Sequence, residues 1–237
     1  MISNQVSNQI FAADMAQLQP WLTRIHLGGD ALAERFNRLR VRALVQQLLS
    51  DEQWRREVAQ RSYAHGNGFD KWVLFDDGNY KLRLHIWYPG VAAEENIHNH
   101  RWNFASVVLA GSLSSDSFDW SDDCQQGEVY QHFHYQATTK QGRYGLQYQG
   151  TRRLVQVSSQ RLAAGSCYGM ESRLLHRIHS QGNEAVITMT LQGPAQRDWT
   201  HWFTQRDIPA QNTEVPVQHF NENTLRDRIY RCLSLIS

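Results

Sequence analysis

Between residues 66 and 205 the chain consists of short runs of aromatic and β-branched residues that are separated by turn residues. One such turn, Asp77-Gly78, stands between two runs and is typical of a β-hairpin. Runs of this kind predict antiparallel strands, which bury a core as a barrel or a jelly roll. We therefore predict a mainly β fold. The runs are WVLF, YKLRLHIWY, NFASVVLA, GLQYQG, RRLVQVSS and AVITMTL.

The segment before these runs has the spacing of helices. Between residues 12 and 64, apolar residues recur three and four positions apart. Asp30, which follows two glycines, has the position of an N-cap, and Ser50 with Gln53 has the pattern of a capping box. We interpret this segment as a helical scaffold.

The end of the chain loses the strand pattern after Pro194, and NTLRDRIYRCL predicts a short C-terminal helix. The organisation that we predict has three parts. An N-terminal helical segment covers residues 1–65, a β barrel covers residues 66–205, and a C-terminal tail over residues 206–237 wraps the barrel.

Composition narrows the classes of partner. The 237 residues include 24 basic and 23 acidic side chains with no basic block, so we expect neither nucleic acid nor a membrane as partner. No signal peptide or long apolar stretch is evident. Cys124, Cys167 and Cys232 are too far apart and odd in number for a disulfide framework. We expect a cytoplasmic protein, and its oligomeric state stays open.

A pair of histidines, His98 and His100, indicates a metal site. Side chains alternate along a strand, so these two project to the same side about 7 Å apart and can converge on one ion. A third histidine, His176, follows further along the chain. The alternative is that the pair arises by chance among the 11 histidines and lies on a solvated strand. We favour a metal centre.

The spacing of these histidines and of the glycines around them resembles the two sequence motifs of the cupin superfamily. Within this superfamily the chain resembles the cysteine dioxygenase-like thiol dioxygenases, through LRLHIWYPG, IHNH, LAGSLSSDSFDW and GSCYGMESRLLHRIHS. It covers about residues 66–205 and implies a cupin jelly roll. Cupins usually add a glutamate four residues after the histidine pair, and in this chain that position falls on Phe104, or at best on Asn103.

The resemblance implies Fe(II) bound by His98, His100 and His176 without a carboxylate. Imidazole ligands alone do not distinguish iron from zinc, copper or nickel. Three neutral ligands leave a divalent ion its full charge, which favours an anionic substrate. His179 is an alternative ligand, or a group just behind the ligands.

A strand over residues 82–88 would place Arg83, His85 and Trp87 on one face. In the thiol dioxygenases the corresponding strand lines the pocket, and Trp87 falls on a matching tryptophan. A buried Arg83 needs an anionic partner, which is either the substrate or a carboxylate of the core. Lys71 or one of its neighbours lies where cysteine-using members carry an arginine, which weakens the resemblance for cysteine as substrate.

The resemblance also places residues beside the metal. His201 falls on a histidine that family members use there, but Phe203 replaces their tyrosine. With Phe104, this residue excludes the cysteine–tyrosine crosslink of some members and predicts a larger or more hydrophobic pocket. The candidate catalytic residues are His201, Arg83 and Tyr168, and the candidate substrate-binding residues are Lys71, Arg83, His85, Trp87, Phe104 and Phe203.

Together, these expectations predict that the protein is an O2-dependent oxidoreductase. It would be a mononuclear non-haem iron(II) dioxygenase acting on a small molecule, either a thiol that becomes a sulfinate or an amino-acid-derived metabolite. The expected partners are that substrate and O2. The alternative is a non-redox metal-binding cupin, such as a small-molecule sensor or a zinc-type lyase or isomerase, because one barrel supports many functions.

Overall fold

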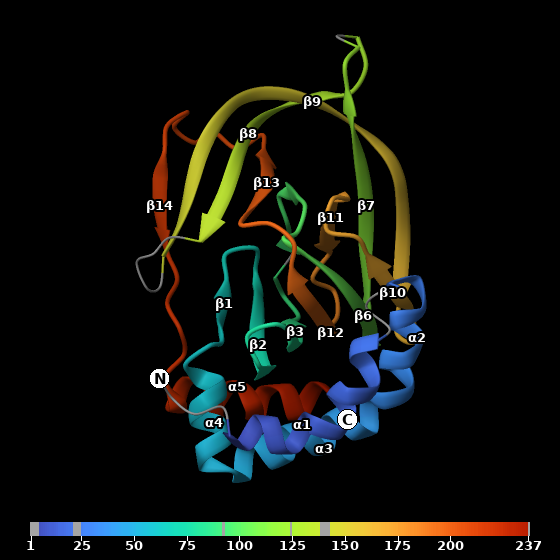
Figure 1. The fold of residues 1–237 in the computed structure, drawn as a ribbon, viewed down its shortest axis with the longest axis vertical. Coiled ribbons are helices and arrows are strands. Elements are labelled where there is room, and N and C mark those ends of the chain that lie inside the picture. The colour runs from blue at the N-terminus through green and yellow to red at the C-terminus, as the bar shows by residue number, and fades with distance from the viewer. Residues whose placement is uncertain (1–4, 21–24, 92, 124, 138–142, 237) are drawn as a thin grey trace.

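The computed structural model describes residues 5–20, 25–91, 93–123, 125–137 and 143–236 (Figure 1). The helices are α1 (Gln5–Leu18), α2 (Ile25–Arg35), α3 (Arg38–Ser50), α4 (Glu52–Ala59) and α5 (Glu222–Leu235). The strands are β1 (Tyr63–His65), β2 (Phe69–Asp76), β3 (Lys81–Trp87), β4 (Ala93–Glu94), β5 (Ile97–His98), β6 (Trp102–Ala110), β7 (Ser112–Ser121), β8 (Glu128–Ala137), β9 (Arg143–Ala163), β10 (Cys167–Met170), β11 (Leu175–Ser180), β12 (Val186–Ala195), β13 (Trp199–Thr204) and β14 (Thr213–Pro216).

The strands form two antiparallel sheets. The first has the order β1-β2-β3-β12-β6-β10, and the second contains the run β9-β7-β11-β5. Early and late strands therefore lie side by side, β3 with β12 and β5 with β11. The sets β3-β12-β6-β10 and β5-β11-β7-β9 have the strand order of a jelly roll. The predicted mainly β, jelly-roll fold with N-terminal helices and a C-terminal helix is confirmed.

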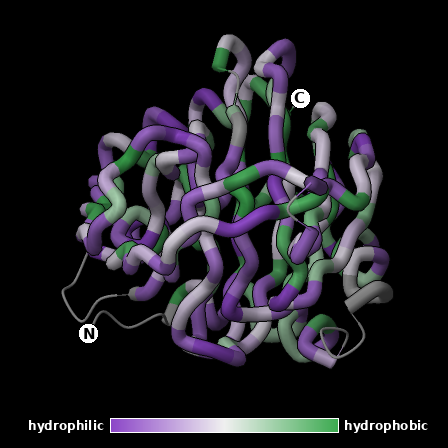
Figure 2. Tube along the Cα trace, turned by 90° about the horizontal axis from the view of Figure 1, so that it is seen from above, coloured by the Kyte–Doolittle hydropathy of each residue, from purple (hydrophilic) through white to green (hydrophobic). Residues whose placement is uncertain are grey.

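Strand β3 divides its side chains between two layers. Its leucine and isoleucine residues pack into a hydrophobic cluster that includes Phe11 and Trp54 of the helices. Arg83, His85 and Trp87 alternate with them and point between the two sheets, where Trp87 joins a separate cluster with residues of the second sheet. Figure 1 shows α1, α3, α4 and α5 gathered at one end of the molecule. Figure 2 shows hydrophilic and hydrophobic residues interleaved along the chain.

Beyond the jelly roll, the second sheet continues into further strands, β13 and β8, which meet β9 again. Strands β13 and β8 extend it beyond β5, and β9 pairs with β7 through one half and with β8 through the other. The arch of β8 and β9 is visible at the top of Figure 1. A separate hydrophobic cluster, on the side of the sheet covered by β8 and β9, includes Ile97, Leu175 and Phe203. Strands β5, β11 and β13 therefore have packed side chains on both faces.

Helix α2 begins at Ile25 and contains Gly28 and Gly29, so the predicted start at Asp30 is wrong. The reason is close packing against β10. A Cβ added to Gly29 would lie only 2.8 Å from the Cβ of Cys167. The glycine therefore allows the helix to approach the strand and does not mark a helix boundary.

Helix α4 begins one residue later than the capping-box pattern predicts. Asp51 is the N-cap, because its side chain accepts a hydrogen bond from the N–H of Trp54 at 2.9 Å. Ser50 is the last residue of α3, and its hydroxyl donates to the carbonyl oxygen of Gln47.

Replacement of Gly29 by alanine is expected to destabilise the protein, although alanine is the better helix former. Overpacking costs about 1–3 kcal/mol, against about 1 kcal/mol gained from helix propensity. The strand cannot easily give way, because the backbone nitrogen of Tyr168 lies 3.1 Å from the added atom. Urea unfolding measures the change, with Glu34→Ala on the exposed side of α2 as a near-neutral control. A Gly29→Ala variant more stable than the wild type would contradict the close packing.

After the barrel, β14 pairs with β9 at the edge of the second sheet. Helix α5 confirms the predicted C-terminal helix and contacts α3 and α4. Cys167 and Cys232 are free thiols, and Cys124 lies outside the described residues. Within the described residues, no helix has both the length and the apolar character needed to cross a membrane.

Candidate metal centre

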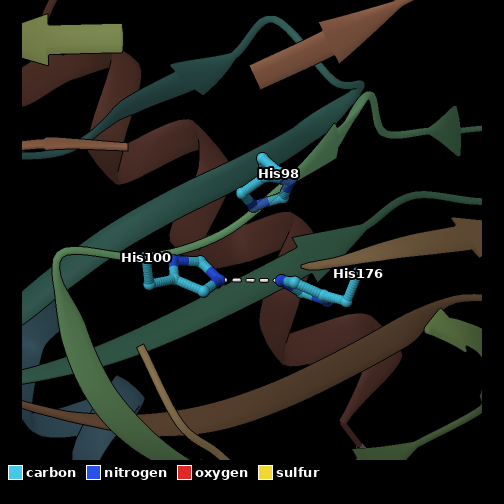
Figure 3. Close-up of side chains that lie close together, drawn as sticks. All are labelled: His98, His100 and His176. Carbon is cyan, nitrogen blue, oxygen red and sulfur yellow. Dashed lines mark hydrogen bonds between the residues drawn. The ribbon is translucent and has the colours of Figure 1, made fainter. Parts of the chain in front are cut away.

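His98, His100 and His176 converge on one point (Figure 3). His98 and His176 are partners on neighbouring strands, and His100 lies in the loop that follows β5. Their ring centroids are 4.8, 4.7 and 4.9 Å apart. The Nε2 atoms of His100 and His176 are 2.8 Å apart. Ligands about 2.1 Å from an ion and at right angles are separated by about 3 Å, so the arrangement fits one face of a metal's coordination sphere.

The protonation of these imidazoles also fits a metal. The Nδ1 atom of His98 lies 2.8 Å from the carbonyl oxygen of Asn96, and donation to that oxygen leaves Nε2 free to coordinate. Burial, followed by the proximity of His98, lowers the pKa of His100 and of His176 well below 6.5. Both rings are therefore neutral near pH 7, as metal ligands must be. Among the described residues, the group contains histidines only.

The face of the first sheet that points between the sheets carries polar side chains. Cross-strand pairing places Lys71 and Thr188 on either side of His85, and Thr190 beside Arg83. Within the described part of the chain, the buried polar atoms of this face that have no hydrogen-bond partner include Nε of Arg83, Nε2 of His85, Nε1 of Trp87 and Oγ1 of Thr188. Such atoms are costly unless a ligand or water pairs with them. This face therefore suits a polar ligand.

The same face is electropositive. Burial lowers the pKa of Arg83 only to about 10, so its guanidinium stays charged at neutral pH. Burial, with added repulsion from Arg83, lowers the pKa of Lys71 well below its usual value, and Glu95 partly opposes this. The side chains of Lys71 and Arg83 also lower the pKa of His100, so both lie close to that ring.

Aromatic side chains form the wall beside His100. The ring of Phe104 lies 4.8 Å from that of His100 and 6.1 Å from that of Tyr168. Trp102 lies 6.0 Å from His100 and carries the guanidinium of Arg83 over its ring at 5.1 Å. Burial raises the pKa of Tyr168 to about 12, so its phenol keeps its proton.

His201 and Phe203 lie on the other face of the second sheet, which corrects their expected positions beside the three histidines. Trp202 is the residue of β13 that pairs with His98, so its two neighbours point the opposite way. Phe203 belongs to the cluster on the arch side. The resemblance placed His201 and Phe203 beside the metal, but on β13 the residue that shares a face with His98 is Trp202.

Two histidines were missed by sequence reasoning. His132 and His134 on β8 form a second histidine group with His201. The signal was present, because His132-Phe133-His134 repeats the pattern of the first pair. His179 belongs to neither group, and its Nε2 lies 3.3 Å from Oδ2 of Asp116.

Comparison with known proteins finds similar solved structures that are cupin-fold proteins. The cupin domain of Schizosaccharomyces pombe Cnp3 is 12% identical, with a TM-score of 0.33 over 53% of this chain and 61% of that one. An RmlC-like cupin from Shewanella frigidimarina is 15% identical, with a TM-score of 0.34 over 57% of this chain and 85% of that one. An oxalate oxidase bound to glycolate is 14% identical, with a TM-score of 0.35 over 58% of this chain and 56% of that one.

No protein-family model and no curated protein matches the sequence. At these TM-scores, the jelly-roll assignment depends on the strand order itself.

Acid is expected to destabilise the fold through His65 and His85. Burial lowers the pKa of both well below 6.5, so they are neutral when folded but take up protons when unfolded. Their contribution is fully present above about pH 6.5 and is lost below it, by up to about 1.4 kcal/mol per pH unit for each. Urea unfolding at several pH values measures how steeply the free energy of unfolding falls with pH. His85→Gln should reduce that slope by up to about 1.4 kcal/mol per pH unit, the contribution of one proton. An unchanged slope in His85→Gln would contradict the conclusion that His85 is neutral in the folded protein.

Proposed function

We propose that this protein is a mononuclear non-haem iron(II) dioxygenase that oxidises a small anionic molecule with O2. The observation that carries the proposal is the donor set, which among the described residues consists of three imidazoles without a carboxylate, with the charged guanidinium of Arg83 close enough to act on His100. Other divalent ions accept the same ligands. The choice of iron follows the sequence resemblance to thiol dioxygenases.

The charge of the pocket supports an anionic substrate. Three neutral ligands leave a divalent ion with both charges, and the Arg83 guanidinium adds another. Buried positive charges without a counter-ion are unfavourable, and a thiolate or carboxylate on the substrate would offset them. The planar guanidinium of Arg83 can hold a carboxylate through paired hydrogen bonds, and its unpartnered Nε is available for one of them.

When bound, iron(II) would supply O2 activation and open coordination positions for the substrate. The side chains of this protein would then orient the substrate and exclude water. Phe104 and Trp102 cover the side of His100 with apolar rings, and Tyr168 offers a protonated phenol as a hydrogen-bond donor. For a thiol substrate the reaction balances without an external reductant, because RSH and O2 together give RSO2H.

Metal analysis followed by oxygen-electrode traces tests the proposal. Protein purified without added metal is expected to contain iron, and it should consume O2 only when a substrate from a panel of thiols and amino-acid derivatives is present. Iron without any substrate-triggered O2 consumption would count against the oxygenase. Zinc in place of iron, together with no O2 consumption, would favour the non-redox alternative.

A further inference from the structure

The second histidine group lies on the opposite face of the second sheet from the first. His132 and His134 are two residues apart on β8, and His201 is the cross-strand partner of His134. The Nε2 atom of His132 lies 2.8 Å from Nδ1 of His201. One nitrogen of each ring lies within 4.8 Å of the others. This spacing matches that of His98, His100 and His176.

Aromatic rings support each of these imidazoles. Trp199 stacks on His134 at 3.9 Å, and Phe203 stacks on His132 at 4.6 Å. The edge of Trp120 meets His201 at 5.1 Å. His132 is buried, and the other two histidines are partly exposed. The group therefore has protein on one side and access to solvent on the other.

The three imidazoles are in the state that a metal requires. Burial, followed by the proximity of the other histidines, lowers the pKa of His132 to about 3 and of His201 to about 4. Burial also lowers the pKa of His134. All three are neutral near pH 7, so each has a ring nitrogen with a free lone pair. Among the described residues, no carboxylate belongs to the group.

We propose that His132, His134 and His201 form a second metal site, which takes a divalent ion of the zinc class and keeps one coordination position for water. Three histidines and a water molecule are an established tetrahedral environment for Zn²⁺. The site is distinct from the first, because the side chains of His201 and Trp202 point to opposite faces of β13.

A hydrogen bond joins the two sites. Asn99, which stands between His98 and His100, accepts through Oδ1 from the backbone N–H of His201 at 2.8 Å. The backbone N–H of Asn99 in turn donates to the carbonyl oxygen of His201 at 3.2 Å. A metal at the second site would therefore restrain β13 against the segment that carries two ligands of the first.

Titration of the chelator-stripped full chain with Co²⁺, whose visible spectrum reports coordination by imidazole, tests the second site. The wild type should bind two equivalents, and His176→Ala should bind one. His134→Phe, which keeps a ring to stack on Trp199 but removes the ligand nitrogen, should also bind one. The affinity of His134→Phe for Co²⁺ at the second site should fall by more than about 100-fold. His219→Ala, which removes a histidine outside both groups, should still bind two.

Tryptophan fluorescence identifies which site is filled. In His176→Ala, Co²⁺ at the second site should quench the emission of Trp120 and Trp199, and the double replacement of these by phenylalanine should remove that quenching. Circular dichroism shows whether each variant is folded. The proposal is overturned if folded His176→Ala binds no Co²⁺, or if His134→Phe binds two equivalents as tightly as the wild type.

Discussion

Replacement of His176 by alanine is expected to abolish both the iron content of the first site and O2 uptake. His176 is the most buried of the three ligands, and its Nε2 lies 2.8 Å from that of His100. Two imidazoles hold a divalent ion much more weakly than three, so the affinity for metal should fall by more than about 100-fold. Metal analysis of the purified variant and oxygen-electrode traces with substrate measure the two losses.

His179→Ala is the matched control for this prediction. His179 lies on the same strand, three residues further on, and its side chain is near Asp116. Side chains three positions apart on a strand point to opposite faces, so His179 should not reach the first site. Its loss should leave iron content and O2 uptake near those of the wild type. Retention of iron at the first site or of O2 uptake in His176→Ala would refute the ligand assignment.

Replacement of Arg83 by methionine is expected to raise KM by about 10- to 100-fold, because a hydrogen bond to a charged group is worth about 1.5–3 kcal/mol. Iron content should not change, because Arg83 is not a ligand. The melting temperature should stay the same or rise, since a buried cation with an unpartnered Nε becomes an apolar side chain of similar length. Steady-state kinetics and thermal melts measure the two effects together.

Arg173→Met separates this effect from a general loss of positive charge. The side chain of Arg173 is 80% exposed and pairs with Glu171 at the surface, so its loss should leave KM near the wild-type value. An unchanged KM in Arg83→Met would remove Arg83 from substrate binding. A lower melting temperature in that variant would indicate that Arg83 has a structural role.

Local patterns in the sequence were sufficient to group His98 with His100 and to predict the inner face of β3, whereas His176 was added through the family resemblance. His98 and His100 share a side because strand side chains alternate, and the same rule places Arg83, His85 and Trp87 together. Both predictions concern neighbours along the chain. The runs of aromatic and β-branched residues also indicated the mainly β fold, because they record which segments are buried as strands.

Only the tertiary structure decided where β13 and β8 lie. His132 and His201 are 69 residues apart, and their contact depends on the register of two strands that the arch brings together. Neighbouring residues on a strand point to opposite faces, and the resemblance by which His201 was placed does not determine the register of β13, so it put His201 with the wrong histidines. Gly29 is a similar case, because the need for glycine comes from Cys167 on a distant strand. The sequence by itself determined the local alternation of side chains, whereas the pairing of distant strands determined which of those side chains meet.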